Sequence, residues 1–226
     1  MYLGIIMRDF LITFNWFMVP LAFVLVSLCL WLRTKHAKGV LGEFAGKLAV
    51  KQWLPESGYE LFSDVMLQDK RGTTQIDHVV VSRFGIFVIE AKGISGKLYA
   101  SSETKYRTWK VYRNGRGYTF QNPYLQNYRH RCALSEVLDV PLDALHDVIF
   151  FPHEDLVLAT PEKVAASFVT GRRKLAEYIL SFKEQRFTAE EVARLTAILN
   201  LKRMKNSREN KKKHTADLKA RWEKKS

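Results

Sequence analysis

Two acids and a lysine stand close together in the segment from Thr73 to Gly93. Asp77 precedes a valine-rich run, and Glu90 and Lys92 close the apolar run that follows it. Carboxylates are preferred ligands of hard divalent cations, and a lysine can neutralise charge that develops on a phosphate. This combination of side chains suits a divalent metal ion and a phosphate group.

The same segment predicts two β-strands joined by a tight turn. Val, Ile and Phe fill most positions from Val79 to Ile89, as in strands that are buried on both faces. Between the two runs, Gly85 supplies the backbone freedom that a tight turn needs. Because side chains alternate along a strand, Glu90 and Lys92 are predicted to point to the same face.

The register of this hairpin decides whether the two acids meet. If Ser82 pairs with Gly85, then Asp77 lies opposite Glu90 at the open end of the hairpin. A loop longer by one residue would set Asp77 opposite Ala91 instead. The sequence leaves both registers open.

The chain carries a formal net charge of +13 and has a pI near 9.7, so polyanions are its natural partners. Eleven Lys or Arg residues and three Asp or Glu residues fall between Lys202 and Ser226, a net charge of +8 for this tail. A solvated helix or a disordered arm is the plain interpretation. The alternative is electrostatic contact with a nucleic-acid backbone or with anionic lipid heads.

An uncharged apolar run from Leu11 to Leu32 is about as long as a helix that crosses a bilayer. A cleaved signal peptide is the alternative, but the run exceeds the usual roughly 7–15 apolar residues and lacks a small-residue cleavage site. Arg33, Lys35 and Lys38 follow the run directly. The positive-inside rule therefore predicts a single-pass membrane protein whose C-terminal part lies in the cytoplasm.

The remaining sequence predicts an α/β domain with helices packed around a mixed sheet. We expect helices over Gly39–Trp53, over Tyr124–Leu138, within Lys163–Phe182 and from Thr188, and further strands over Tyr59–Leu67, Lys97–Ser101, Tyr106–Tyr112, Tyr118–Gln121, Val148–Phe151 and Leu156–Ala159. Asn122 is predicted to cap the helix that starts at Pro123, and Thr188-x-x-Glu191 is a capping box. The predicted boundaries are 1–33 for the anchor, 38–160 for the domain, 161–201 for a helical extension and 202–226 for the basic tail.

Several short motifs occur in a fixed order along the chain: Gly42-Glu43, Asp77-His78, the run GIFVIEAKG from Gly85 to Gly93, Gly96, Trp109 and Asn122-Pro123-x-x-Gln126. Together they resemble the nuclease-related domain (NERD) family, which is similar to the PD-(D/E)xK nuclease superfamily. The resemblance covers roughly Lys38 to Thr160. It implies a restriction-endonuclease-like mixed sheet flanked by helices. The transmembrane helix that the apolar run predicts before this domain, and the basic tail, lie outside the resemblance.

The resemblance also implies a ligand set for Mg²⁺ or Mn²⁺. Asp77 and Glu90 would bind the ion, joined by the backbone carbonyl of Ala91. Glu43, from the first helix, would be a further ligand directly or through water, although a solvated helix face suits it equally well. Magnesium commonly takes one or two carboxylates together with phosphate oxygens and water.

Lys92 would steer the attacking water or neutralise phosphate charge, and Gln126 would hold the water or a phosphate oxygen. Structural roles are the alternative, since acids can end strands and Lys92 can form a same-face ion pair. His78 should point away from Asp77 and is interpreted as structural, and Trp109 as packing. Arg129–Arg131 are interpreted as surface charge, or as contacts to a phosphate backbone.

The leading hypothesis is a membrane-anchored, Mg²⁺-dependent nuclease that hydrolyses phosphodiester bonds of DNA, with RNA left open. A noncatalytic nucleic-acid-binding or membrane-tethering module with the same fold is the alternative. In a third hypothesis the tail docks on anionic lipid and the domain serves as a membrane scaffold. The sequence contains neither a P-loop nor Gly-x-Ser-x-Gly, which argues against nucleotide hydrolysis and serine-protease chemistry.

Overall fold

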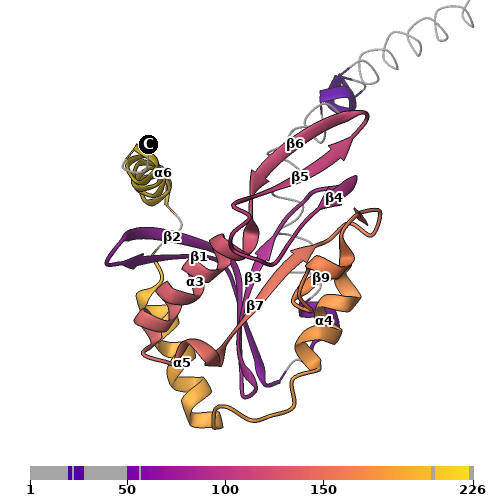
Figure 1. Ribbon diagram of the computed structural model, residues 1–226. Coiled ribbons are helices and arrows are strands. Elements are labelled where there is room, and N and C mark those ends of the chain that lie inside the picture. Colours follow the sequence, from indigo (N-terminus) through magenta and orange to yellow (C-terminus); the bar gives the residue numbers. More distant parts are fainter. Residues whose placement is uncertain (1–19, 22, 28–49, 56, 205–206, 224–226) are drawn as a thin grey trace, which may run out of the picture. The chain divides into compact units, whose positions relative to one another are not determined.

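The computed structural model describes residues 20–21, 23–27, 50–55, 57–204 and 207–223, and from residue 59 onward it is a mixed α/β structure with two sheets (Figure 1). The strands are β1 (Tyr59–Asp69), β2 (Gly72–Ser82), β3 (Gly85–Ala91), β4 (Lys97–Tyr99), β5 (Thr108–Arg113), β6 (Arg116–Gln121), β7 (Leu145–Phe151), β8 (Val157–Leu158) and β9 (Phe168–Thr170). The helices are α3 (Pro123–Leu138), α4 (Arg172–Leu180), α5 (Ala189–Lys202) and α6 (Arg208–Glu223), with short 3₁₀ turns at Leu142–Ala144 and Pro161–Lys163.

The larger sheet has the strand order β1-β2-β3-β7-β9. The first three strands are antiparallel neighbours, whereas β7 runs parallel to both β3 and β9. In the β2–β3 turn Ser82 pairs with Gly85, which is the register that sets Asp77 opposite Glu90. Gly85 has a φ of 133°, and a Cβ there would lie 2.3 Å from Nε2 of His146. Only glycine fits at this position of the turn.

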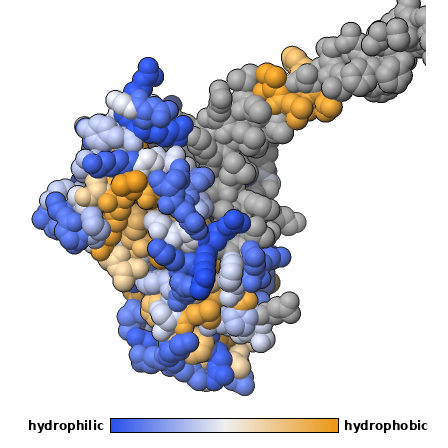
Figure 2. Space-filling model, turned by 90° about the vertical axis from the view of Figure 1, so that its right-hand side faces the viewer, coloured by the Kyte–Doolittle hydropathy of each residue, from blue (hydrophilic) through white to orange (hydrophobic). Residues whose placement is uncertain are grey.

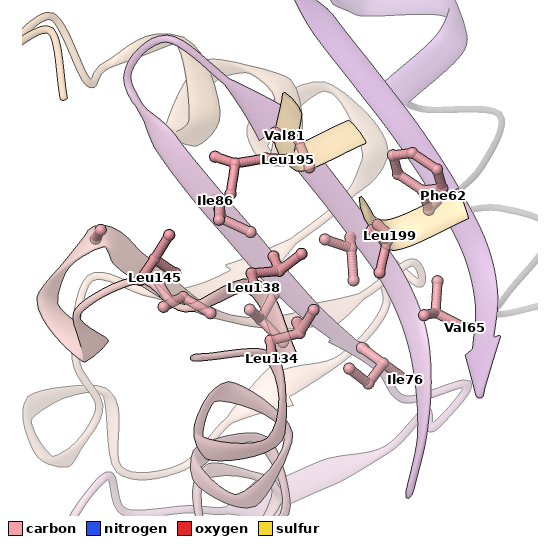
Figure 3. Close-up of a cluster of buried hydrophobic side chains, with 14 of the residues drawn as sticks. Phe62, Val65, Ile76, Val81, Ile86, Leu134, Leu138, Leu145, Leu195 and Leu199 are labelled. Carbon is pink, nitrogen blue, oxygen red and sulfur yellow. The ribbon is translucent and has the colours of Figure 1, made fainter. Parts of the chain in front are cut away.

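Both faces of the larger sheet are covered by apolar side chains. Helices α3 and α5 cover one face, where Leu134, Leu138, Leu195 and Leu199 pack against the strands (Figure 3). On the other face, α4 and the segment around Val50 pack against a second set of strand residues. This burial on both sides explains why β2 and β3 are almost continuously hydrophobic.

A second, four-stranded sheet has the order β6-β5-β4-β8. Its inner side packs through Trp109, which contacts Tyr124 of α3, Phe151 of β7 and Phe168 of β9. The expectation of one mixed sheet was therefore wrong, because four of the predicted strands form a sheet of their own. The segment Lys163–Phe182 contains a helix, α4, as predicted, and also the short strand β9, which was not predicted.

The N-terminal predictions fall largely outside the described residues. Pro20, Leu21 and residues 23–27 are helical, and Figure 2 shows them as mainly hydrophobic. No helix among the described residues has the length and apolar character needed to span a bilayer. The predicted helix over Gly39–Trp53 is described only from residue 50, where it is helical.

The C-terminal part consists of two helices. Helix α5 opens with the predicted capping box, in which Thr188 accepts a hydrogen bond from the amide of Glu191. Residues 208–223 of the basic tail form α6, which lies against β2. Oδ2 of Asp217 accepts hydrogen bonds from the amide of Thr73 at 2.9 Å and from its hydroxyl at 2.7 Å.

Candidate active site

Asp77 is held at the open end of the β2–β3 hairpin. The paired register runs to His78 opposite Ile89, and the next pair in sequence is Asp77 and Glu90. Oδ2 of Asp77 accepts a hydrogen bond from the backbone amide of Ala91 at 2.8 Å. The backbone amide of Ala91, next to Glu90, therefore orients the Asp77 carboxylate.

Glu90 is a buried carboxylate with a cationic partner. Only 1% of the residue is exposed, yet Nζ of Lys92 donates to its Oε1 and Nε2 of His130 lies 3.2 Å from its Oε2. Burial on its own would raise the pKa of Glu90, but the Lys92 charge and the His130 contact outweigh it and lower that pKa. Glu90 is thus kept ionised inside the protein.

Lys92 bridges the hairpin and helix α3. Its ammonium also donates to Oε1 of Gln126 at 3.1 Å. Burial would lower the pKa of Lys92, but the negative charges of Glu90 and Asp77 raise it overall. Because the ammonium stays protonated, Lys92 is suited to neutralising negative charge and is unsuited to acting as a base.

Helix α3 brings Gln126 and His130 to the site. Asn122 caps the helix by accepting a hydrogen bond from the amide of Tyr124 at 3.0 Å, as predicted. The spacing of four residues places Gln126 and His130 on the same side of the helix. Nδ1 of His130 lies 2.8 Å from the hydroxyl oxygen of Thr74, so a residue of strand β2 orients the imidazole through the ring nitrogen that does not contact Glu90.

Asn127 ties α3 to the middle of the sheet. Its Nδ2 donates to the carbonyl of Val88 at 2.8 Å and also to Oδ1 of Asp147 on β7. Burial raises the pKa of Asp147 to about 6, although the Asn127 hydrogen bond opposes this shift. The helix that carries Gln126 and His130 is therefore fixed against both β3 and β7.

The structure brings together most of the predicted site: Asp77, Glu90, Ala91, Lys92 and Gln126. Glu43 lies outside the described residues. The predicted structural role of His78 agrees with its position, because it is buried and its Nδ1 lies 3.0 Å from Oγ of Ser63. The predicted packing role of Trp109 is confirmed, because the residue is buried and its Nε1 donates to the carbonyl of Ser101.

His130 is the residue that the sequence interpretation missed. It was assigned, with Arg129 and Arg131, to surface charge or phosphate contact, but only 4% of it is exposed and it contacts Glu90. Arg129 and Arg131 are also partly buried, contacting Asp69 and the carbonyl of Leu142. The available signal was the four-residue spacing from Gln126, which places His130 on the side of α3 that faces the site.

The donors at the strand end fit a hard cation bound by few protein ligands. Within the part of the chain that the structure describes, no three His, Cys, Asp or Glu side chains form a group that could hold a metal ion. Asp77 and Glu90 supply two carboxylates, which is the usual number for Mg²⁺ when phosphate and water complete its shell. Both acids already act on one cation, the ammonium of Lys92.

Comparisons with known proteins agree with this geometry. The family model described as "Nuclease-related domain" matches residues 38–152. An uncharacterized protein of Bacillus anthracis is 33% identical over 115 residues, which are 51% of this chain and 53% of that protein. The match thus spans about half the length of that relative. No solved structure matches the chain.

Proposed function

Because this chain belongs to the nuclease-related domain family, we propose that it is a metal-dependent nuclease that hydrolyses phosphodiester bonds of DNA, with RNA left open. One observation carries the proposal. Lys92 contacts Glu90 and Gln126 at the strand end that also holds Asp77. Acids, ammonium and amide from three elements thus converge at one place, where a phosphate could meet them.

The proposed cofactor is Mg²⁺ or Mn²⁺, held by Asp77 and Glu90 with the backbone carbonyl of Ala91. When bound, such an ion would stabilise the negative charge that develops on the phosphate and lower the pKa of a bound water. Asp77 suits this role because the Ala91 amide orients its carboxylate. Glu90 suits it because its lowered pKa keeps it charged.

The other residues of the site would act on the substrate. Lys92 is a point charge on a flexible stem, so it can exchange an oxygen of Glu90 for an oxygen of the phosphate. Gln126, whose amide contacts Lys92, would hold the attacking water or a phosphate oxygen. His130 and Thr74 would act through Glu90 by fixing the orientation of its carboxylate.

We further propose that residues 11–32 anchor the chain in a membrane as a single-pass protein, with the domain in the cytoplasm. The apolar run and the basic residues that follow it support this proposal. The basic tail would contact a phosphate backbone or anionic lipid. Helix α6 supports this role because Lys211, Lys212 and Lys213 are exposed on it.

Cleavage of supercoiled and linear DNA in the presence of Mg²⁺ tests the proposed activity. We expect the wild-type chain to cleave, Asp77→Ala and Lys92→Ala to lose at least about 100-fold in rate, and EDTA to stop the reaction. Glu136→Ala is a matched control, because Glu136 is an exposed acid of α3 that forms an ion pair with the exposed Lys70. Equal rates for all four proteins would refute the site assignment.

A noncatalytic nucleic-acid-binding module is the second candidate, and one observation favours it. Both oxygens of Glu90 already have partners, Lys92 and His130, so the carboxylate is satisfied without a metal ion. This candidate predicts salt-sensitive DNA binding that EDTA leaves unchanged, with no cleavage product under any metal condition. Product formation that depends on Asp77 would eliminate it.

A further inference from the structure

The four-stranded sheet presents tyrosines and lysines on its outer side. Leu98, Trp109 and Val111 point inward and are buried, so their neighbours in the strands point outward. The outward residues Lys97, Tyr99, Lys110 and Tyr112 form what we call the tyrosine–lysine face. Across the β4–β5 pair, Lys97 lies opposite Tyr112 and Tyr99 lies opposite Lys110, so the two residue types alternate.

The two rings of the face are accessible and close together. Tyr99 is 41% exposed and Tyr112 is 40% exposed. Their ring centroids are 5.8 Å apart, with the ring planes at 75°. Nζ of Lys110 lies 4.7 Å from the Tyr112 centroid, and Nζ of Lys97 lies 5.9 Å from the Tyr99 centroid. Large flat surfaces and positive charges are therefore intermixed on one exposed sheet.

The charge of this sheet is entirely positive. Strands β4, β5 and β6 contain four Lys or Arg residues and no Asp or Glu. Gly117 on β6 leaves room for the face, because a Cβ there would lie 3.1 Å from both Cε of Lys110 and Cε1 of Tyr112. A partner with negative charge and flat rings would complement this surface.

The small sheet is attached to the candidate active site at both of its ends. β4 begins five residues after Lys92, and β6 ends five residues before Gln126. Five residues span at most about 18 Å. Trp109 on the inner side packs against Tyr124, which lies on the same helix as Gln126. The face and the site are thus parts of one packed structure.

We propose that the tyrosine–lysine face binds single-stranded nucleic acid, with one base stacked on Tyr99 and another on Tyr112, and with Lys97 and Lys110 against the phosphates. Stacking on exposed aromatic residues beside basic groups is a common way of holding single strands. That this strand is then the substrate of the site rests on the proposed function. The binding itself does not.

The affinity gained by stacking a base on a tyrosine ring exceeds the affinity of the lysine–ring contacts that are present in the structure. A base stacked on an aromatic side chain is worth about five- to 150-fold in affinity. An exposed contact between a lysine and a ring is worth only about two- to fivefold. A base can therefore displace Lys97 or Lys110 from the ring, and the freed ammonium is then available to a phosphate.

Fluorescence anisotropy with a labelled oligothymidylate of about 12 nucleotides tests this binding on the full-length chain, with EDTA present so that cleavage is prevented. We expect Tyr99→Ala and Tyr112→Ala each to weaken binding at least about fivefold, and Tyr99→Phe and Tyr112→Phe to bind nearly as well as wild type because the rings remain. A blunt duplex of the same length should bind equally to wild type and to these variants, because its bases stay stacked.

Tyr118→Ala is the matched control for the rings. Tyr118 is 45% exposed in the same sheet, but it pairs with Val111 and so belongs to the opposite side. We expect it to change the affinity less than about twofold. For the charges, Lys97→Ala and Lys110→Ala should reduce the salt dependence of binding, whereas Lys183→Ala, between α4 and α5, should leave it unchanged.

Three results would overturn the proposal. Two of them are unchanged oligonucleotide binding in the Tyr99→Ala/Tyr112→Ala double variant and an equal loss of oligonucleotide affinity in Tyr118→Ala. The third is a double variant that no longer binds phosphatidylserine vesicles but still binds the oligonucleotide. The last result would assign the face to a membrane surface.

Asp77→Ala separates this proposal from the proposed nuclease. If wild type and Asp77→Ala both bind through the tyrosines and neither cleaves, the face stands and the nuclease assignment fails. If wild type and the double variant cleave single strands equally fast and bind them with equal affinity, the nuclease assignment stands and the binding role of the face fails.

Discussion

Nε2 of His130 lies 3.2 Å from Oε2 of Glu90, while the other ring nitrogen lies 2.8 Å from the hydroxyl of Thr74. A strand residue thus orients an imidazole, and the imidazole orients a buried carboxylate. Under the proposed function, His130 and Thr74 would support a metal ligand without touching the metal or the substrate. Supporting residues of this kind are commonly worth a factor of about 10–100 in affinity or rate.

His130→Ala should therefore lower kcat for DNA cleavage by about 10–100-fold and raise the Mg²⁺ concentration needed for half-maximal rate, with little change in KM. His130→Gln keeps a donor near Glu90 and should retain more activity. The control is Tyr128→Ala on the same helix, because Tyr128 is 53% exposed. A larger effect on KM for DNA than on kcat would show that His130 contacts the substrate instead.

Lys92→Met should destabilise the folded chain by about 3 kcal/mol at pH 7, because removal of one partner leaves the Glu90 carboxylate buried with less compensation. His130 still contacts Glu90, so we expect the lower end of the usual range. Urea unfolding measures the change. Glu90→Gln in the same chain should recover much of the loss, and the exposed Lys70→Met should cost far less.

The pH dependence of that loss has a fixed sign. The pKa of Glu90 is lowered below its ordinary value of 4.5 in the folded chain, so its contribution to stability is present above pH 4.5. The contribution disappears as the pH falls through the folded-state pKa. The stability difference between wild type and Lys92→Met should therefore shrink as the pH falls below 4.5, and a difference that grows with acidification would contradict this account.

Asp147 should behave in the opposite way. Burial raises its pKa from 3.8 to about 6, so above pH 6 the ionised form disfavours folding by about 3 kcal/mol. Asp147→Asn keeps an acceptor for Asn127 and should stabilise the chain near pH 8 by up to this amount. The gain should fall as the pH drops through 6 and vanish below 3.8. Asp143→Asn, which is exposed, serves as the control in the same unfolding measurements.

Asp217→Ala should release helix α6 from β2. The change removes both hydrogen bonds to Thr73, and each hydrogen bond to a charged group contributes about 1.5–3 kcal/mol when it is well shielded from water. We expect amide hydrogen exchange in α6 to accelerate at least about tenfold while exchange in β3 is unchanged. Lys212→Ala, at an exposed position of α6, should leave the exchange rates as they are. Equal exchange in both variants would contradict the docking.

The hairpin that carries the acids could be predicted from the sequence because its signals are local. Continuous Val, Ile and Phe indicated buried strands, and Gly85 marked the turn. The structure has the register that pairs Ser82 with Gly85, and this arrangement sets Gly85 against His146, where a side chain would collide. The sequence left this choice open because His146 is 61 residues away along the chain.

The partition into two sheets could not be predicted in the same way. Alternating residues such as Thr108, Trp109 and Lys110 indicate a strand with one buried face, but they do not identify the sheet to which it belongs. β9 was missed because its three residues, Phe168–Thr170, are too few to show a period. His130 was missed because its charged neighbours suggested a solvated face, whereas the helix turns it toward Glu90.

The contact between His130 and Thr74 joins residues that lie far apart in the sequence. During synthesis, a nascent chain acquires Glu90 and Lys92 long before α3 has left the ribosome. Glu90 then lacks the imidazole of His130, and Lys92 lacks the amide of Gln126. An incomplete polypeptide thus carries the acids without their support, and the proposed reaction would have to wait until the helix has been translated and packed.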